Sequence, residues 1–195
     1  LGSIGSAAYY NVLDALYPNS IQANISGGDP EKIKELSYDQ LIETHKNYYH
    51  PSNSLMILYG NLDYTRFLEM IDEKYLKEFD KKEMDIDYGK IEPLKKKTEK
   101  TYKFPAGANA SVANAAQIDY AFSLTDVSEE DLIGLSVIVS VLNQEASPMK
   151  QAFAEKQIGG RMSIRLDDSL VQPVLIFTAE NADESRKNEF MALVD

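Results

Sequence analysis

Residues 80–100, DKKEMDIDYGKIEPLKKKTEK, constrain the fold more than any other stretch of this chain. They are densely charged, contain Gly89 and Pro93, and show no sustained apolar period of a helix or a strand. A segment with so few apolar side chains buries too little surface to belong to a core. We therefore interpret residues 80–100 as a charged linker between a first part, residues 1–79, and a second part, residues 101–195.

The first part follows a helix, strand, helix order. Its longest helix has a clear start, because Ser37 and Gln40 occupy the two positions of a capping box. The apolar run SLMILYG has the length of a buried strand. The predicted elements are a helix over Tyr9–Tyr17, a turn capped by Asp29, a helix from Ser37 to Pro51, a strand over Leu55–Tyr59 and a helix that begins at Asp63.

The second part also mixes strands and helices. Ser128 and Ser147 are typical N-caps, and acidic residues follow Ser128 in the first turn, where the helix dipole favours them. The predicted elements are strands over 100–105, 116–124, 161–166 and 171–178, helices after Ser128 and Ser147, and a terminal amphipathic stretch. The fold class is therefore α/β or α+β, with a mixed sheet and packed helices.

Composition excludes several classes of partner. Twenty basic and thirty-one acidic side chains give a net charge of −11, which repels nucleic acid and anionic lipid alike. No apolar run approaches the roughly 20 residues that span a bilayer. The absence of cysteine excludes disulfides and thiolate chemistry and agrees with a cytoplasmic location. The N-terminus lacks a signal peptide, and we expect the chain to be cut from a longer protein.

Glu43, His45 and His50 raise the question of a metal site, since the chain has no other histidine. Zinc motifs on helices place two histidines four positions apart on one face. A spacing of five separates the two rings by about 140° around the helix, and Pro51 then breaks the helix. We therefore expect no zinc here, with His45 buried or half-buried beside a hydrogen-bonding neighbour and His50 at the helix end.

Other polar clusters also lack a complete site. Asp85 and Asp87 resemble the start of a calcium loop, but the later ligand positions hold the wrong residues. Asp167 and Asp168 fit a turn between two strands, and Gly27–Gly28 fits a plain turn better than a phosphate loop. No G-x-S-x-G motif occurs. The residues themselves therefore assign no catalytic or metal-binding position, and they leave substrate-binding residues unknown.

The order of motifs resembles one known family. Residues 26–63, SGGDPEKIKELSYDQLIETHKNYYHPSNSLMILYGNLD, are similar to a segment of the pitrilysin/insulinase zinc metallopeptidases, in their presequence-protease and falcilysin branch. Residues 145–160, EASPMKQAFAEKQIGG, and residues 171–183, VQPVLIFTAENAD, resemble the next domain of that branch, which carries no metal. The resemblance covers nearly the whole chain and is strongest over residues 26–63.

The resemblance implies a clam-shell peptidase of four related α/β domains that hydrolyses enclosed peptides with one zinc ion. The family's H-x-x-E-H motif lies N-terminal to the part matched here, and its substrate-contacting Arg and Tyr residues lie in the far C-terminal half. No catalytic residue is therefore carried over to this chain, which is expected to be inactive alone and to bind no zinc itself. Residues 1–79 would end the catalytic-type domain, and residues 101–195 would begin the metal-free one.

Two other hypotheses stay open. The chain can belong to a metal-free homologue that acts as a non-catalytic partner or peptide-binding subunit, or to an unrelated α/β binding module. For the leading hypothesis, the expected partners are peptide substrates and the rest of its own polypeptide. Without neighbouring strands, the Leu55–Tyr59 strand would present an unpaired apolar edge, so self-association of the isolated chain is also expected.

Overall fold

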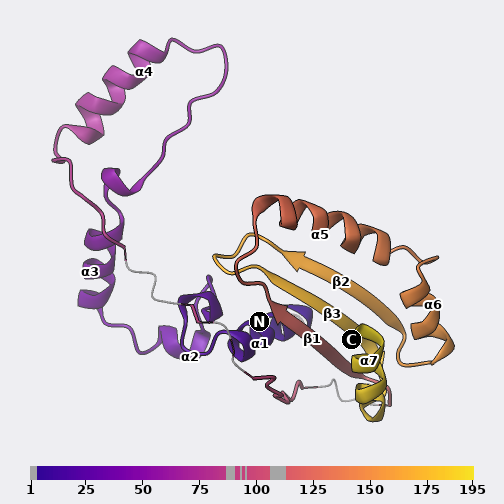
Figure 1. Ribbon diagram of the computed structural model, residues 1–195. Helices are drawn as coiled ribbons and strands as arrows, with labels where there is room; N and C mark the ends of the chain where they lie inside the picture. The colour runs from indigo at the N-terminus through magenta and orange to yellow at the C-terminus, as the bar shows by residue number, and fades with distance from the viewer. Residues whose placement is uncertain (1–3, 87–90, 93, 95, 106–112) are drawn as a thin grey trace. The chain divides into compact units, whose positions relative to one another are not determined.

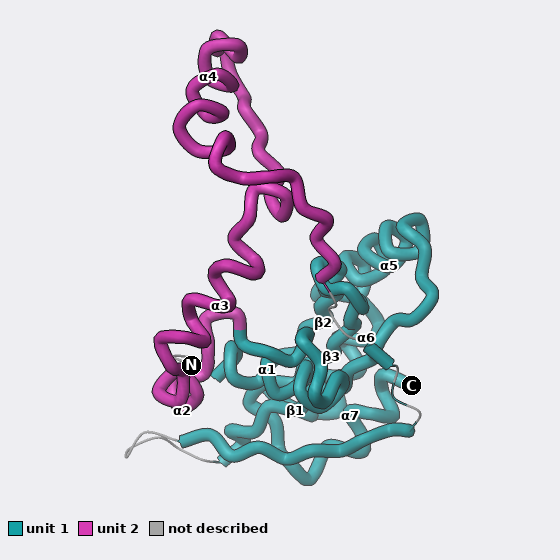
Figure 2. The backbone as a smooth tube through the Cα atoms, turned by 90° about the vertical axis from the view of Figure 1, so that its left-hand side faces the viewer, with its two compact units in different colours: residues 1–25, 89–195 teal, residues 26–88 magenta. Residues whose placement is uncertain are grey.

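The structure is a computed structural model that describes residues 4–86, 91, 92, 94, 96–105 and 113–195 (Figure 1). The chain divides into two compact units, coloured separately in Figure 2. Unit 1 comprises residues 1–25 and 89–195, and unit 2 comprises residues 26–88. These bounds differ from the predicted parts 1–79 and 101–195, and whether the latter are two related domains stays a prediction.

Unit 1 is built on a three-stranded antiparallel sheet. Its strands are β1 (Ala116–Ser123), β2 (Arg161–Asp167) and β3 (Val174–Ala182), in the spatial order β1-β3-β2. Phe177 of the central strand pairs with Tyr120 on one side and with Ile164 on the other. The α/β fold class is confirmed, with an antiparallel sheet in place of the mixed one expected.

Three helices cover one face of this sheet (Figure 1). They are α5 (Glu129–Leu142), α6 (Pro148–Glu155) and α7 (Lys187–Val194). Ser128 caps α5 and Ser147 caps α6, as the sequence predicted, and Asp131 completes a capping box with Ser128. The main core lies between these helices and the sheet, and its buried side chains are Phe153, Ile158, Met162, Ile164, Phe177, Ala179, Ala182 and Phe190.

The opposite face of the sheet receives the N-terminal helix α1 (Ile4–Leu16). Neighbouring residues of a strand point to opposite faces, so Ile176 lies on the face away from Phe177. Ile176 and Val174 join Leu13, Leu16 and Tyr17 in a second buried cluster. The 3₁₀ turn η1 (Ile21–Ala23) follows α1. The segment from α1 to η1 therefore contributes to the core of unit 1.

Unit 2 consists of short helices with well-formed starts. They are α2 (Pro30–Ile33), α3 (Tyr38–Tyr48), the 3₁₀ turn η2 (Pro51–Asn53) and α4 (Tyr64–Ile71), which continues into a π-helical turn, η3 (Asp72–Leu76). The predicted caps are confirmed, because Asp29, Ser37 and Asp63 each accept a backbone N–H from the turn they begin. The Ser37 and Gln40 capping box is complete.

Three predicted strands need correction. Residues 55–59 and 100–105 form no strand, because no described strand lies beside either segment to complete its hydrogen bonds. Leu55 and Tyr59 are 87% and 95% exposed. β3 begins at Val174 instead of Val171, since the backbone N–H of Gln172 donates to the Gln22 side chain, at 2.9 Å.

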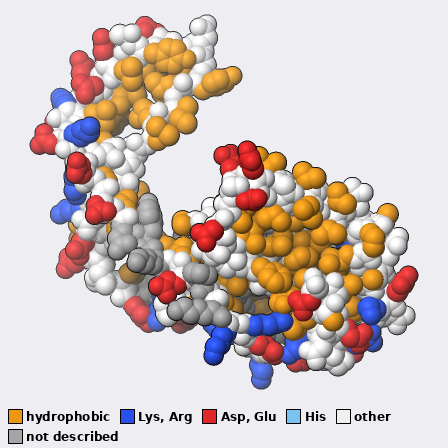
Figure 3. Space-filling view, viewed as in Figure 1, with side chains coloured by type: hydrophobic (Ala, Val, Ile, Leu, Met, Phe, Trp, Pro, Cys, Tyr) orange, Lys and Arg blue, Asp and Glu red, His pale blue; other side chains and the backbone are white. Residues whose placement is uncertain are grey.

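Apolar side chains remain exposed on both units, and Figure 3 shows one such group over α5. The α5 group comprises Ile133, Val137, Ile138 and Val141. The group on unit 2 includes Tyr38, Leu41, Tyr49, Leu55, Ile57, Tyr59 and Leu68. None of the helices in the described part of the chain is long and apolar enough to cross a bilayer.

Candidate functional site

The histidines singled out from the sequence do not form a site. His45 is exposed on α3 and stacks on Tyr49, with ring centroids 4.8 Å apart. The expectation that His45 is buried or half-buried beside a hydrogen-bonding neighbour is therefore wrong, because its ring lies at the surface of α3 against the Tyr49 ring. The Nδ1 atom of His50 accepts the Ser52 backbone N–H at 3.1 Å, and its ring contacts Phe79 edge-on. His50 thus lies just after the helix end, as expected, and its side chain caps the 3₁₀ turn η2.

Asp167 has a structural role on the α1 side of the sheet. Its carboxylate accepts hydrogen bonds from Tyr9 at 2.6 Å, Ser169 at 2.6 Å and Arg165 at 2.8 Å. Burial alone would raise the pKa of Asp167, but the hydrogen bonds from Ser169 and Tyr9, with the charge of Arg165, hold it below the usual value. Burial and the same hydrogen bond raise the pKa of Tyr9 to about 12. This carboxylate therefore fastens α1 to β2.

This arrangement predicts an acid-sensitive contribution to stability. The pKa of Asp167 is lower in the folded chain than in the unfolded chain, where it is 3.8. The ionised carboxylate therefore stabilises the fold at pH values above 3.8, and this stabilisation is lost as the pH falls through the pKa of the folded chain. Asp167→Asn should therefore lower the unfolding midpoint at pH 7, and the difference from the unaltered chain should shrink below pH 4. Urea unfolding from pH 3 to 7 measures this difference, and a constant difference would contradict it.

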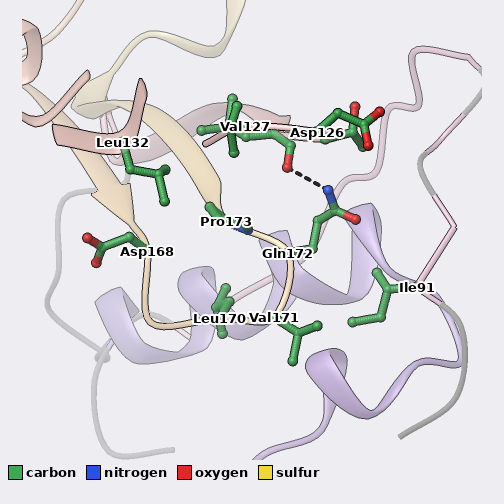
Figure 4. A pocket seen from close by; sticks show the side chains of 11 residues that line it. Ile91, Asp126, Val127, Leu132, Asp168, Leu170, Val171, Gln172 and Pro173 are labelled. Carbon is green, nitrogen blue, oxygen red and sulfur yellow. Dashed lines mark hydrogen bonds between the residues drawn. The ribbon is translucent and has the colours of Figure 1, made fainter. Parts of the chain in front are cut away.

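A pocket of about 550 Å³ opens where two loops of unit 1 meet (Figure 4). One loop joins β1 to α5, and the other joins β2 to β3. Apolar side chains from both loops and from α5 line the pocket together with polar groups. The pocket is lined by Ile91, Leu124, Thr125, Asp126, Val127, Leu132, Asp168, Leu170, Val171, Gln172 and Pro173. Its size falls within the range of small-molecule binding pockets.

Hydrogen bonds from the N-terminal segment hold the floor of this pocket. The Gln22 side chain, which is buried, accepts the Gln172 backbone N–H and donates to the Gln172 carbonyl, both at 2.9 Å. The Gln172 side chain in turn donates to the Leu124 carbonyl at 2.5 Å (Figure 4). The Leu124 N–H donates to the Pro173 carbonyl oxygen at 2.9 Å. These hydrogen bonds hold the two loops together without a ligand.

Two carboxylates flank the pocket, and neither is engaged within the described chain. Asp126 and Asp168 lie on opposite sides, with Pro173 and Gln172 between them (Figure 4). Asp126 adopts a left-handed backbone conformation, with φ at 53°, which Asp tolerates better than most residues. The sequence placed both Asp167 and Asp168 in a turn. Asp168 does lie in the loop after β2, whereas Asp167 is the buried last residue of β2, and Asp126 was not predicted. A lone acidic residue between a strand and a helix cap gives no spacing signal.

Comparison with known proteins identifies the family. Residues 35–193 match the Peptidase M16 inactive domain, so the chain belongs to the M16 peptidase family, the pitrilysin/insulinase family expected from its motifs. It is 31% identical over 191 residues to protein HypA of Clostridium perfringens, covering 97% of this chain and 20% of that protein.

Two further relatives are mitochondrial presequence proteases. The Drosophila melanogaster protein is 42% identical over 66 residues, covering 34% of this chain and 6% of that protein. The Mus musculus protein is 29% identical over 151 residues, covering 74% of this chain and 14% of that protein. The chain thus spans at most about a fifth of each of these three relatives.

The zinc chemistry of M16 peptidases does not fit the residues described here. No group of three or more His, Cys, Asp or Glu side chains that could hold a metal ion occurs within the described ranges. His45 stacks on a tyrosine, and His50 is occupied by a backbone N–H. Asp85 is exposed, while Asp87, Gly89 and Lys90 of the rejected calcium loop lie outside the described residues.

Proposed function

We propose that this chain is an internal segment of a zinc-dependent peptidase that degrades peptides in an enclosed chamber. The segment itself supplies scaffold and chamber wall and carries no catalytic residue. The single observation that supports this most is the match of residues 35–193 to the inactive domain of the family. The coverage of HypA, 20% of its length, supports a parent protein much larger than the segment. Peptide substrates and the rest of its own polypeptide are its proposed partners.

The sequence of the parent gene tests this proposal against its main alternative. An H-x-x-E-H motif upstream of residue 1 would supply two zinc ligands and a general base. Loss of that motif would favour the alternative, a metal-free homologue that acts as a peptide-binding subunit or other non-catalytic partner. Fractionation of the source cells would test the cytoplasmic location that we propose for the parent, since the presequence proteases above are named as mitochondrial.

We predict that the isolated 195-residue chain binds less than one equivalent of zinc and turns over no peptide. Two histidines at a spacing of five and no cysteine cannot form the usual set of three or four ligands. Elemental analysis after dialysis, together with a quenched-peptide assay, measures both properties. One tightly held equivalent that disappears in His45→Ala or His50→Ala would overturn the prediction, as would chelator-sensitive turnover that survives repurification.

We also propose that the isolated chain self-associates through residues 55–59. These residues are apolar, and Leu55, Met56, Ile57 and Tyr59 are exposed; their backbone groups form no strand in the described chain and can pair with a second copy. Ile57→Lys should lower the average mass measured by light scattering across a concentration series, because a charge within the paired segment opposes association. Leu41→Lys, an equally charged change at an exposed position of α3, is the control. Identical masses for both variants would contradict this role for residues 55–59.

A further inference from the structure

We propose that the outer face of helix α5 packs against an apolar helix of the same polypeptide, from a part that lies outside residues 1–195. The inference rests on the proposed function in taking this chain as a segment of a larger protein. It deepens that proposal, because it names the face through which unit 1 joins the rest of its polypeptide and the chemistry of the partner.

The exposed apolar side chains of the sheet and its three helices are concentrated on α5 (Figure 3). Five large apolar side chains are exposed between residues 113 and 195, and four of them belong to α5. They are Ile133, Val137, Ile138 and Val141, with exposed fractions of 53–61%. Single apolar residues are ordinary on a protein surface, whereas a continuous group marks a face that another surface covers.

The two helices beside α5 show how an uncovered face of this unit is built. After Pro148, the exposed positions of α6 and α7 are polar or small: Gln151, Ala154, Glu155, Asn188, Glu189 and Ala192. α5, in contrast, has no charged residue from Leu132 to Leu142, and its Val139 and Leu142 pack on the main core. A helix that is apolar on both its inner and its outer side is typical of the interior of a larger protein.

The spacing of the exposed residues fits a helix as the partner. Ile133, Val137 and Val141 follow one another at intervals of four, so they form one ridge along α5. Gly134 lies in the next row, and a Cβ there would meet nothing within 4 Å. The missing side chain leaves a notch beside the ridge, which a side chain of a partner helix can fill. Glycine in a helix costs about 1 kcal/mol relative to alanine, and close packing at this position would offset that cost.

The same polypeptide is the occupant that length and charge favour. The chain covers 20% of HypA, so most residues of the proposed parent lie elsewhere. A segment tethered to unit 1 meets α5 at a high effective concentration. A second copy lacks this tether and meets the repulsion of two net charges of −11. The contact surface of the partner should be uncharged, because the ridge offers no opposite charge to pair with one.

Thiol labelling on α5 tests the proposal, because the chain has no cysteine of its own. Val137→Cys is introduced into the 195-residue chain and into the full-length parent, and mass spectrometry follows the reaction of that peptide with iodoacetamide. We expect the thiol to react at least about tenfold more slowly in the parent, since labelling there requires local opening. Gly134→Leu fills the notch, so it should raise this rate in the parent and leave it unchanged in the 195-residue chain.

Two further positions separate coverage of α5 from other effects. Gln151→Cys, at an exposed position of α6, should react equally fast in both proteins. Met162→Cys lies in the main core, where Met162 is 2% exposed, and should be protected in both proteins. Its protection in the 195-residue chain shows that unit 1 is folded while the α5 thiol is open.

Four results would overturn the proposal. Equal rates for Val137→Cys in the two proteins would show that α5 is open in the parent. Protection of this thiol in the 195-residue chain would assign the face to a second copy if it grows with concentration, and to this chain itself if it does not. Equal protection of Gln151→Cys in the parent would make the burial unspecific, and an unchanged rate with Gly134→Leu would leave the notch empty. None of these results bears on whether the parent is a zinc peptidase, which its upstream motif and zinc content decide independently.

Discussion

Replacing Gly159 with alanine should destabilise unit 1 by about 1–3 kcal/mol, because the new methyl group meets backbone that cannot yield. A Cβ at this position would lie 2.8 Å from the Glu180 carbonyl oxygen and 3.2 Å from the Cα and Cβ of Ala182. Both partners belong to the central strand β3, which pairs on both sides. The adjacent Gly160 N–H donates to the same Glu180 carbonyl at 2.9 Å, so a shift would also strain that hydrogen bond.

A second glycine provides the opposite case. Gly134 lies in α5, and a Cβ there meets nothing within 4 Å. Gly134→Ala should therefore stabilise the chain by up to about 1 kcal/mol, through the higher helix propensity of alanine. Urea unfolding followed by circular dichroism compares the two variants. Equal unfolding midpoints for Gly159→Ala and the unaltered chain would contradict the prediction. They would show that β3 can move away from the loop that precedes β2 in the sequence.

Local signals in the sequence predicted most helix starts. Caps such as Ser37, Ser128 and Ser147 act through hydrogen bonds within one turn, so a short stretch of sequence contains the whole interaction. Strands were predicted less well than helix starts. Residues 55–59 have the composition of a strand, but a strand also needs a neighbour, and none is supplied within the described residues.

The pocket could not be predicted from the sequence for a related reason. Asp126 and Asp168 are separated by two helices and a strand, and only the antiparallel return of β3 places their loops together. The fixing residue, Gln22, lies still farther away along the chain, 150 positions from Gln172. Pairings of this length leave no periodic pattern. The family resemblance, by contrast, depended on an ordered run of local motifs and was confirmed.

A substitution of Leu13 tests whether helix α1 belongs to unit 1. Leu13 is 2% exposed and packs with Val174 and Ile176. Leu13→Ala should cost about 2–5 kcal/mol through lost contacts and the cavity left behind. Hydrogen exchange locates where that loss falls. For amides that exchange through global opening of unit 1, at least about a thirtyfold faster rate is expected over β3.

Ile4→Ala on the same helix is the control, because Ile4 is 55% exposed and its truncation should cost about 0.5 kcal/mol or less. The amides of α3 should exchange at the same rate in all three chains, since α3 belongs to unit 2. The predicted first part, residues 1–79, leads to the opposite expectation, because it groups the α1 segment with α3. Faster exchange in α3 with an unchanged β3 would therefore assign α1 to the first part and remove Leu13 from the core of unit 1.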